Sequence, residues 1–274
     1  MKTAVKIIIV LCIVAFFVWQ RQPQRARFQQ WPTPVVVPQR PAPVAVQQGN
    51  APQPRPVQTA SPARGFNNRL WYGNDTAKDL DPLLTRRNFL IVLDGSGSMA
   101  DSRCSGNLSK IAAAKQAIAA FATKIKPEDN LGLCAFDSRG VTERAPLSLN
   151  RSAFNTALQA VRSDSNTPLG TAVTLGYSLL QTQARRQLGY GEYYLVVVTD
   201  GEADKGNDPR DIVNKITSQS PVVISTIGFC IGRGHSLNRP GLTLYHDATD
   251  LAQLNQGLES VLAESEFSDA PAAK

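Results

Sequence analysis

Two apolar stretches of this chain, residues 89–93 and 193–198, are each followed closely by oxygen-bearing side chains. The side chains are those of Asp94, Ser96, Ser98 and Asp200. Apolar runs of this length are typical of buried parallel strands, and ligand sites in open α/β sheets lie where such strands end. Carboxylates and hydroxyls without His or Cys suit Mg²⁺, Ca²⁺ or Mn²⁺. We therefore predict a divalent-ion site at the carboxyl ends of two strands.

A third element, Thr167 in Asn166-Thr167-Pro168, lies between the two stretches. The order Asp-x-Ser-x-Ser, then Thr before a helix, then Thr-Asp-Gly after a strand resembles the von Willebrand factor type A (vWA) domain, over about residues 86–264. The resemblance implies one divalent ion at the family's metal-ion-dependent adhesion site (MIDAS), held by Asp94, Ser96, Ser98, Thr167 and Asp200. It also implies an open coordination position, which a partner protein fills with an Asp or Glu carboxylate. Many family members have two glycines where this chain has Ser165 and Asn166, so the shape of this loop is left open.

Enzymatic alternatives fit the same stretch less well. Gly95-x-Gly97-x-x-Ala100 matches a dinucleotide fingerprint, but the helix is expected to begin only near Asn107, too late to meet a pyrophosphate. Ser96 lacks the G-x-S-x-G context of a hydrolase nucleophile. Surface positions or satisfied polar contacts are expected for the two histidines, His235 and His246. We predict no catalytic residue; a metal-assisted hydrolase or a nucleotide- or cofactor-binding enzyme on the same sheet is the alternative.

Two further interpretations concern the site itself. A degenerate domain could keep the fold without holding a metal. Three acids crowd the Asp200 loop and are expected to be solvated, with a role as hydrogen-bond acceptors behind the ligands as the alternative. These acids are Glu202, Asp204 and Asp208.

Strand-like and helix-like segments alternate after residue 86, which predicts an α/β fold. We expect one domain, residues 86–264, with a doubly wound, mostly parallel sheet flanked by helices on both faces. Beyond the two strands above, the expected elements are a helix near 108–125, a strand at 131–136, helices at 151–161 and 168–183, a helix that begins at Asp208-Pro209, a strand at 222–229, a late strand that contains His246 and a last helix capped by Asp250.

The positive charge of the chain is concentrated near its N-terminus. Residues 1–70 hold nine of the 29 Lys and Arg residues and no Asp or Glu, so the rest of the chain is close to neutral. This distribution argues against nucleic acid as a partner and favours an anionic surface near the N-terminal segment. No small-molecule substrate is expected.

The N-terminal third has the composition of a membrane tether. Residues 1–21 contain an apolar run with no small-x-small cleavage pattern after it, which predicts an uncleaved signal anchor, a single transmembrane helix. Residues 22–63 hold ten of the 18 prolines and predict a disordered Pro/Gln linker. We expect an N-terminal extension at 64–85 that packs on the domain, and a flexible tail at 265–274. The predicted location is the inner membrane with the domain in the periplasm, or a secreted or periplasmic protein if the signal is cleaved.

Cysteine placement leaves one pairing open. Cys104 follows the Asp94 motif and Cys230 ends a predicted strand, so both should lie at the carboxyl edge of the sheet. In an oxidising compartment they can pair; otherwise they are free thiols. Cys134 is expected as a small buried apolar residue and Cys12 as a lipid-facing one.

Overall fold

The computed structural model describes residues 70–74 and 77–267. The predicted anchor (1–21) and linker (22–63), with Cys12, lie outside the described residues, as do positions 268–274 of the expected tail. In the part of the chain that the structure describes, no helix has the length and apolar character needed to span a bilayer.

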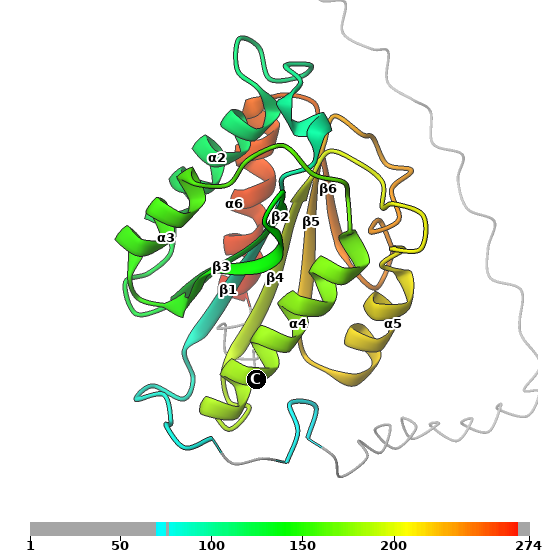
Figure 1. The fold of residues 1–274 in the computed structure, drawn as a ribbon. Helices are drawn as coiled ribbons and strands as arrows, with labels where there is room; N and C mark the ends of the chain where they lie inside the picture. The colour runs from blue at the N-terminus through cyan, green and yellow to red at the C-terminus, as the bar shows by residue number, and fades with distance from the viewer. Residues whose placement is uncertain (1–69, 75–76, 268–274) are drawn as a thin grey trace, which may run out of the picture. The chain divides into compact units, whose positions relative to one another are not determined.

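A six-stranded mixed sheet forms the centre of the domain, in the order β3-β2-β1-β4-β5-β6 (Figure 1). Neighbouring strands are parallel except for the antiparallel pair of β2 and β3. The strands are β1 (Arg87–Asp94), β2 (Asn130–Asp137), β3 (Gly140–Ser148), β4 (Glu192–Thr199), β5 (Val223–Phe229) and β6 (Leu244–Ala248). All eight residues of β1 and all eight of β2 are buried, which explains why their sequences are so apolar.

Helices cover both faces of this sheet. One apolar core joins the sheet to α2, α3 and α6, and the other joins it to α4 and α5 (Figure 1). The helices are α2 (Lys110–Lys124), α3 (Arg151–Gln159), α4 (Leu169–Arg186), α5 (Arg210–Gln219) and α6 (Leu251–Phe267). Alternate residues of β1 point into opposite cores, as the pleat of a strand requires. The predicted α/β architecture is therefore confirmed.

Three details differ from the expectation. The sequence pattern predicts neither β3 nor the short 3₁₀ helix η1 (Gly97–Ala100). β3 is an edge strand that carries charged residues and Pro146. An edge strand tolerates a proline because its backbone N–H groups bond to a neighbouring strand on one side only. At the C-terminus, α6 continues to Phe267, past the expected boundary at 264, and Gln253 N donates to Asp250 Oδ1 (2.8 Å) as the predicted cap.

The segment before β1 packs on the domain at the amino end of β4. The Trp71 ring lies 5.1 Å from the ring of Tyr193 and 6.1 Å from that of Tyr177, measured between centroids. Tyr72 and Asp81 are buried in the same region. These aromatic contacts hold the entry to β1 at the end of the sheet opposite Asp94.

Candidate metal site

The two predicted carboxylates lie at the same edge of the sheet because their strands are neighbours. β1 and β4 pair in parallel with Leu93 opposite Val198, so Asp94 and Asp200 leave adjacent strands at their carboxyl ends. Asp94 is fully buried and Asp200 is 5% exposed. The strand order thus brings together two acids that are more than one hundred positions apart in sequence.

The loop after Asp94 is joined by backbone hydrogen bonds to the loop that carries Thr167. Gly97 N donates to the Ser165 carbonyl (2.8 Å), and Asp164 N donates to the Gly95 carbonyl (3.0 Å). Gly95 has no space for a side chain, since a Cβ there would lie 2.3 Å from two backbone oxygens. Ser165, which stands where many vWA domains have glycine, takes part in this pairing through its backbone, so the loop closes on the Asp94 motif without that glycine.

A chain of hydrogen bonds connects the hydroxyls to the acids. Asp94 Oδ1 accepts from Ser96 N (2.7 Å), the Ser96 and Ser98 hydroxyls are 3.0 Å apart, and Ser98 Oγ donates to Asp200 Oδ1 (2.7 Å). Thr167 Oγ1 and Ser98 Oγ both lie 3.8 Å from the position that a Cβ on Gly201 would take. The structure therefore gathers all five predicted residues at one place, and Ser98 is the exposed member of the set.

Burial changes the acid–base behaviour of Asp94. Desolvation raises the pKa of its carboxyl from 3.8 to about 6, although hydrogen bonds from Ser96 and Thr199 act in the opposite direction. The negative charge of Asp200 also raises this pKa. A cation placed between the two acids would relieve both the desolvation and the repulsion.

Three contacts at the site go beyond the five predicted residues. Two of them involve Thr199 and Lys110, for which the sequence predicts no role at the site, and the third involves Asp204, for which support of the ligands is the alternative role. Thr199 Oγ1 donates to Asp94 Oδ2 (2.5 Å), and Lys110 Nζ donates to Asp200 Oδ2 (2.7 Å). Asp204 and Thr167 hold each other: Thr167 N donates to Asp204 Oδ2 (2.8 Å) and Asp204 N donates to the Thr167 carbonyl (3.0 Å). One sequence signal for Lys110 exists, because a lysine in the first turn of a helix is unfavourable with the helix dipole and implies a special partner.

The acids after Asp200 divide into two kinds. The expectation of a solvated side chain is wrong for Asp204, which is partly buried and bonded to the Thr167 backbone. Glu202 and Asp208 are exposed; Glu202 accepts weakly from Ser236 N (3.3 Å) and Asp208 pairs with Arg210. Only a tertiary contact, that of Asp204 with Thr167, distinguishes the partly buried acid from the two exposed ones, because all three follow β4 in the same polar loop.

Both histidines are hydrogen-bonded to groups other than Ser96. His235 Nε2 is 2.9 Å from the Gly201 carbonyl and its Nδ1 accepts from Leu237 N (3.1 Å), while His246 Nε2 is 2.8 Å from Ser260 Oγ. Satisfied polar contacts, as expected, account for both rings. The long helix after the Asp94 motif begins at Lys110, which agrees with the argument against a bound pyrophosphate.

Cys104 and Cys230 form a disulfide that ties the loop after the Asp94 motif to the end of β5. The bond closes a sequence separation of 126 residues at the carboxyl edge of the sheet. Of the two interpretations, pairing is therefore the one found. Cys134 is a free, buried thiol, as expected.

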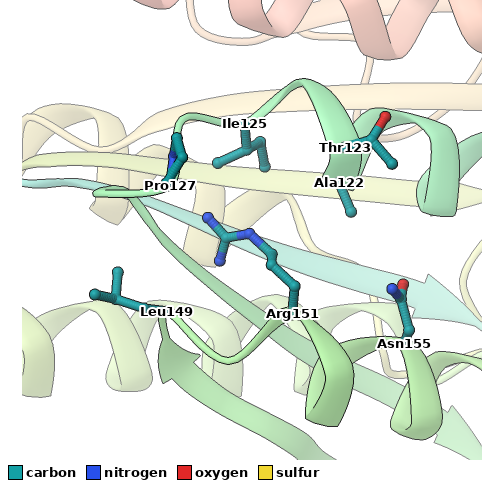
Figure 2. Close-up of a pocket in the computed structure, with 7 residues that line it drawn as sticks. All are labelled: Ala122, Thr123, Ile125, Pro127, Leu149, Arg151 and Asn155. Carbon is teal, nitrogen blue, oxygen red and sulfur yellow. The ribbon is translucent and has the colours of Figure 1, made fainter.

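A hollow of about 320 Å³ lies near the amino end of β2, between the end of α2 and the start of α3. Figure 2 shows Arg151 extending toward Pro127 and Ile125 across this space. The Arg151 guanidinium is satisfied by backbone carbonyls, including that of Asp129 at 2.7 Å. This hollow contains no acid, so it does not compete as a metal site. Among residues 70–74 and 77–267, no group of three or more His, Cys, Asp or Glu could hold a metal ion; the Asp94 site differs in using hydroxyls.

Comparisons with known proteins agree with this geometry. The sequence profile of the von Willebrand factor type A domain family matches residues 89–202. The comparison with curated proteins finds no match.

Solved structures with a similar fold are distant in sequence. One is a von Willebrand factor type A protein from Catenulispora acidiphila (17% identity, TM-score 0.54, 66% of this chain and 43% of that chain). Another is the pilus adhesin SpaC from Lactobacillus rhamnosus GG (14%, 0.52, 69% and 31%). A third is proximal thread matrix protein 1 of the mussel byssus, with zinc in its MIDAS motif (16%, 0.50, 68% and 48%).

This chain spans less than half the length of each of those three chains. At such low identities the likeness shows the fold and leaves function to be argued from the site. The profile match covers the Asp94 motif, Thr167 and Asp200, and the sheet order and helices are those described above. Residues 89–202 of this chain are therefore similar to a von Willebrand factor type A domain, and the described residues have a fold like that of solved members.

Proposed function

We propose that this vWA domain binds a protein partner through a divalent ion held by Asp94, Ser96, Ser98, Thr167 and Asp200. The observation that carries the proposal is the convergence of these residues at the carboxyl ends of β1 and β4. Two carboxylates and three hydroxyls form a set of hard oxygen donors, which fits Mg²⁺, Ca²⁺ or Mn²⁺. The zinc in the MIDAS of the mussel protein supports a divalent ion at such a motif.

The donor set also suggests how a partner would be held. Two acids cannot satisfy an ion that prefers six or more oxygen ligands, and hydroxyls add no charge. A carboxylate from a partner would therefore complete the shell and neutralise the remaining charge of the ion. Ser98 is exposed, so the site is accessible from solvent at this position. The partner class is a protein surface that presents an Asp or Glu side chain.

Binding is favoured over catalysis by what surrounds Ser96. Its hydroxyl contacts that of Ser98, and the rings of His235 and His246 are bonded elsewhere. A metal-assisted hydrolase needs a general base within hydrogen-bond reach of the attacking group, and Asp94, the carboxylate bonded to Ser96, is the one that this proposal assigns to the ion. The adhesin role named for SpaC is consistent with a binding module. Turnover of ester or phosphate substrates that is lost in Ser96→Ala would favour the alternative.

We also propose that the domain is tethered to the inner membrane by residues 1–21 and extended into the periplasm by residues 22–63. The apolar run and the Pro/Gln composition of these segments support this arrangement. The Cys104–Cys230 disulfide is consistent with an oxidising compartment. Fractionation tests the tether: the full-length chain is expected with the membranes, and a soluble protein that begins beyond Trp19 would show a cleaved signal.

Calorimetry with Mn²⁺ and Mg²⁺ tests the metal site directly. We expect one site in the wild-type domain and at least about tenfold weaker affinity in Asp94→Ala, because the ion loses a charged ligand. Glu128→Ala is the matched control, since Glu128 is an exposed acid just before β2, at the other end of the sheet. Equal affinity in wild type and Asp94→Ala would refute the assignment. A candidate partner should then bind in Mg²⁺ and be released by EDTA.

A further inference from the structure

Lys110 and Asp200 form a buried ion pair at the candidate metal site. Lys110 Nζ lies 2.7 Å from Asp200 Oδ2, and the two side chains are 4% and 0% exposed. The other oxygen of the same carboxylate, Oδ1, accepts from Ser98. One of the five proposed metal ligands is therefore already paired with a cation that belongs to the chain.

The position of Lys110 is unfavourable for a lysine unless a negative charge lies beside its ammonium group. Lys110 is the first residue of α2, where the positive end of the helix dipole repels a cation, and the first turn contains no acid. Burial removes the hydration of the ammonium group as well. Asp200 is the counter-charge that the structure places beside it, and it offsets both penalties.

The charge of Lys110 changes what a divalent ion meets at the site. Asp94 and Asp200 alone would present two negative charges, and the ammonium group reduces the sum to one. An incoming ion also experiences direct repulsion from Lys110, in a buried region where charges are weakly screened. Both effects lower the affinity for the ion. In the absence of metal, the same charge stabilises Asp200, whose carboxylate would otherwise be buried without a counter-charge.

From this arrangement we infer that Lys110 is a resident counter-cation of the site, which stabilises the metal-free domain and weakens the binding of a divalent ion. The inference rests on the proposed metal site and adds a regulation to it. A weakly held ion with uncompensated charge gains more from a partner carboxylate. The site would then be occupied firmly only when metal and partner are both present.

Removing the charge of Lys110 should have opposite effects on the two states. In Lys110→Met, we expect the melting temperature in EDTA to fall by on the order of 10 °C, because Asp200 is left buried and unpaired. The Mn²⁺ dissociation constant, measured by the electron paramagnetic resonance of the free ion, should become at least about tenfold smaller. Lys110→Gln keeps a hydrogen-bond donor without the charge and should also bind Mn²⁺ more tightly if Lys110→Met folds poorly.

Two further variants identify the cause. Lys124→Met is the matched control, because Lys124 lies on the same helix in an exposed ion pair with Glu259 and should leave both measurements unchanged. Adding Asp200→Asn to Lys110→Met removes the unpaired charge and should recover part of the lost melting temperature. If the melting temperature is not recovered in the double variant, the loss in Lys110→Met comes from packing, and the proposed role of Lys110 in the metal-free domain is wrong.

The results separate this inference from the proposed function. If wild type binds Mn²⁺ through Asp94 and both Lys110 variants bind it equally or more weakly, the metal site stands and the counter-cation role fails. If neither wild type nor the variants bind Mn²⁺, the proposed function fails and takes the inference with it. If only the Lys110 variants bind Mn²⁺, Lys110 excludes the ion from the wild-type site, which upholds its role and overturns metal-dependent binding by this chain.

Discussion

The acid–base behaviour of Asp94 provides a direct test of how the site is built. Desolvation raises the pKa of this buried carboxyl from 3.8 to about 6 in the metal-free domain. The substitution Asp94→Asn removes the titration and keeps the shape. The carbonyl oxygen of the substituted side chain can still accept from Ser96 N, and its amide group can donate to the hydroxyl oxygen of Thr199.

The expected size follows from the pKa shift. Each unit corresponds to 1.36 kcal/mol, so a rise from 3.8 to about 6 amounts to about 3 kcal/mol. Because the folded-state pKa is raised, the folded domain holds the proton where the unfolded chain has released it. This stability is fully present below pH 3.8 and is lost as the pH rises through about 6. The free energy of unfolding should therefore fall across this window.

Urea unfolding in EDTA between pH 3.5 and 7.5 measures the effect. The useful quantity is the difference between wild type and Asp94→Asn, because other groups titrate in both proteins. Burial lowers the pKa of His246, which gives the opposite slope near pH 6, and the arginines around Asp137 hold its pKa at about 2 against the effect of burial. Both contributions cancel in the difference.

We expect wild type to lose about 2 kcal/mol of the full effect of about 3 kcal/mol relative to Asp94→Asn from pH 4 to pH 7, because the unfolded chain is already partly ionised at pH 4. Added Mg²⁺ should reduce this loss in wild type alone, because the ion binds the ionised carboxylate and stabilises the folded state. A difference that stays constant within about 0.5 kcal/mol would refute the argument from burial. A slope that is unaffected by Mg²⁺ would leave the burial argument intact and count against the metal site.

Three further predictions concern the supports of the site. Gly95→Ala should destabilise the domain by about 1–3 kcal/mol or more, because its Cβ would lie 2.3 Å from two backbone oxygens. Gly97→Ala is the control: its Cβ would make only an ordinary contact at 3.9 Å, so the urea midpoint should change little. Cys104→Ser should lower the free energy of unfolding by about 2–5 kcal/mol, because the disulfide closes a sequence separation of 126 residues. Dithiothreitol should lower the melting temperature of wild type but not that of the variant. Asp204→Ala should weaken Mn²⁺ binding about 10–100-fold, because it removes the acceptor that fixes the backbone of Thr167; unchanged affinity would show that this loop needs no such support.

The sequence was sufficient to predict the central strands and to single out the acids and hydroxyls that the structure brings together at their ends. The runs before Asp94 and Asp200 are apolar because both faces of β1 and β4 are covered, and this pattern is visible without coordinates. The alternation with helices then predicts a parallel sheet, whose strand ends meet at one edge. The pattern was weakest at β3, since an edge strand is buried on fewer sides and its polar residues conceal the alternation.

Only the tertiary structure decided which side chains touch. The pairs Lys110–Asp200 and Thr199–Asp94 join residues 90 and 105 positions apart, and the choice of Cys230 as the partner of Cys104 depends on where β5 ends. Periodicity reports the local backbone and which face is buried, but contacts of this range depend on strand order and loop closure. For the same reason, the sequence could not distinguish Asp204, which holds Thr167, from Asp208, which faces solvent: loop acids look alike until the fold gives one of them a backbone partner.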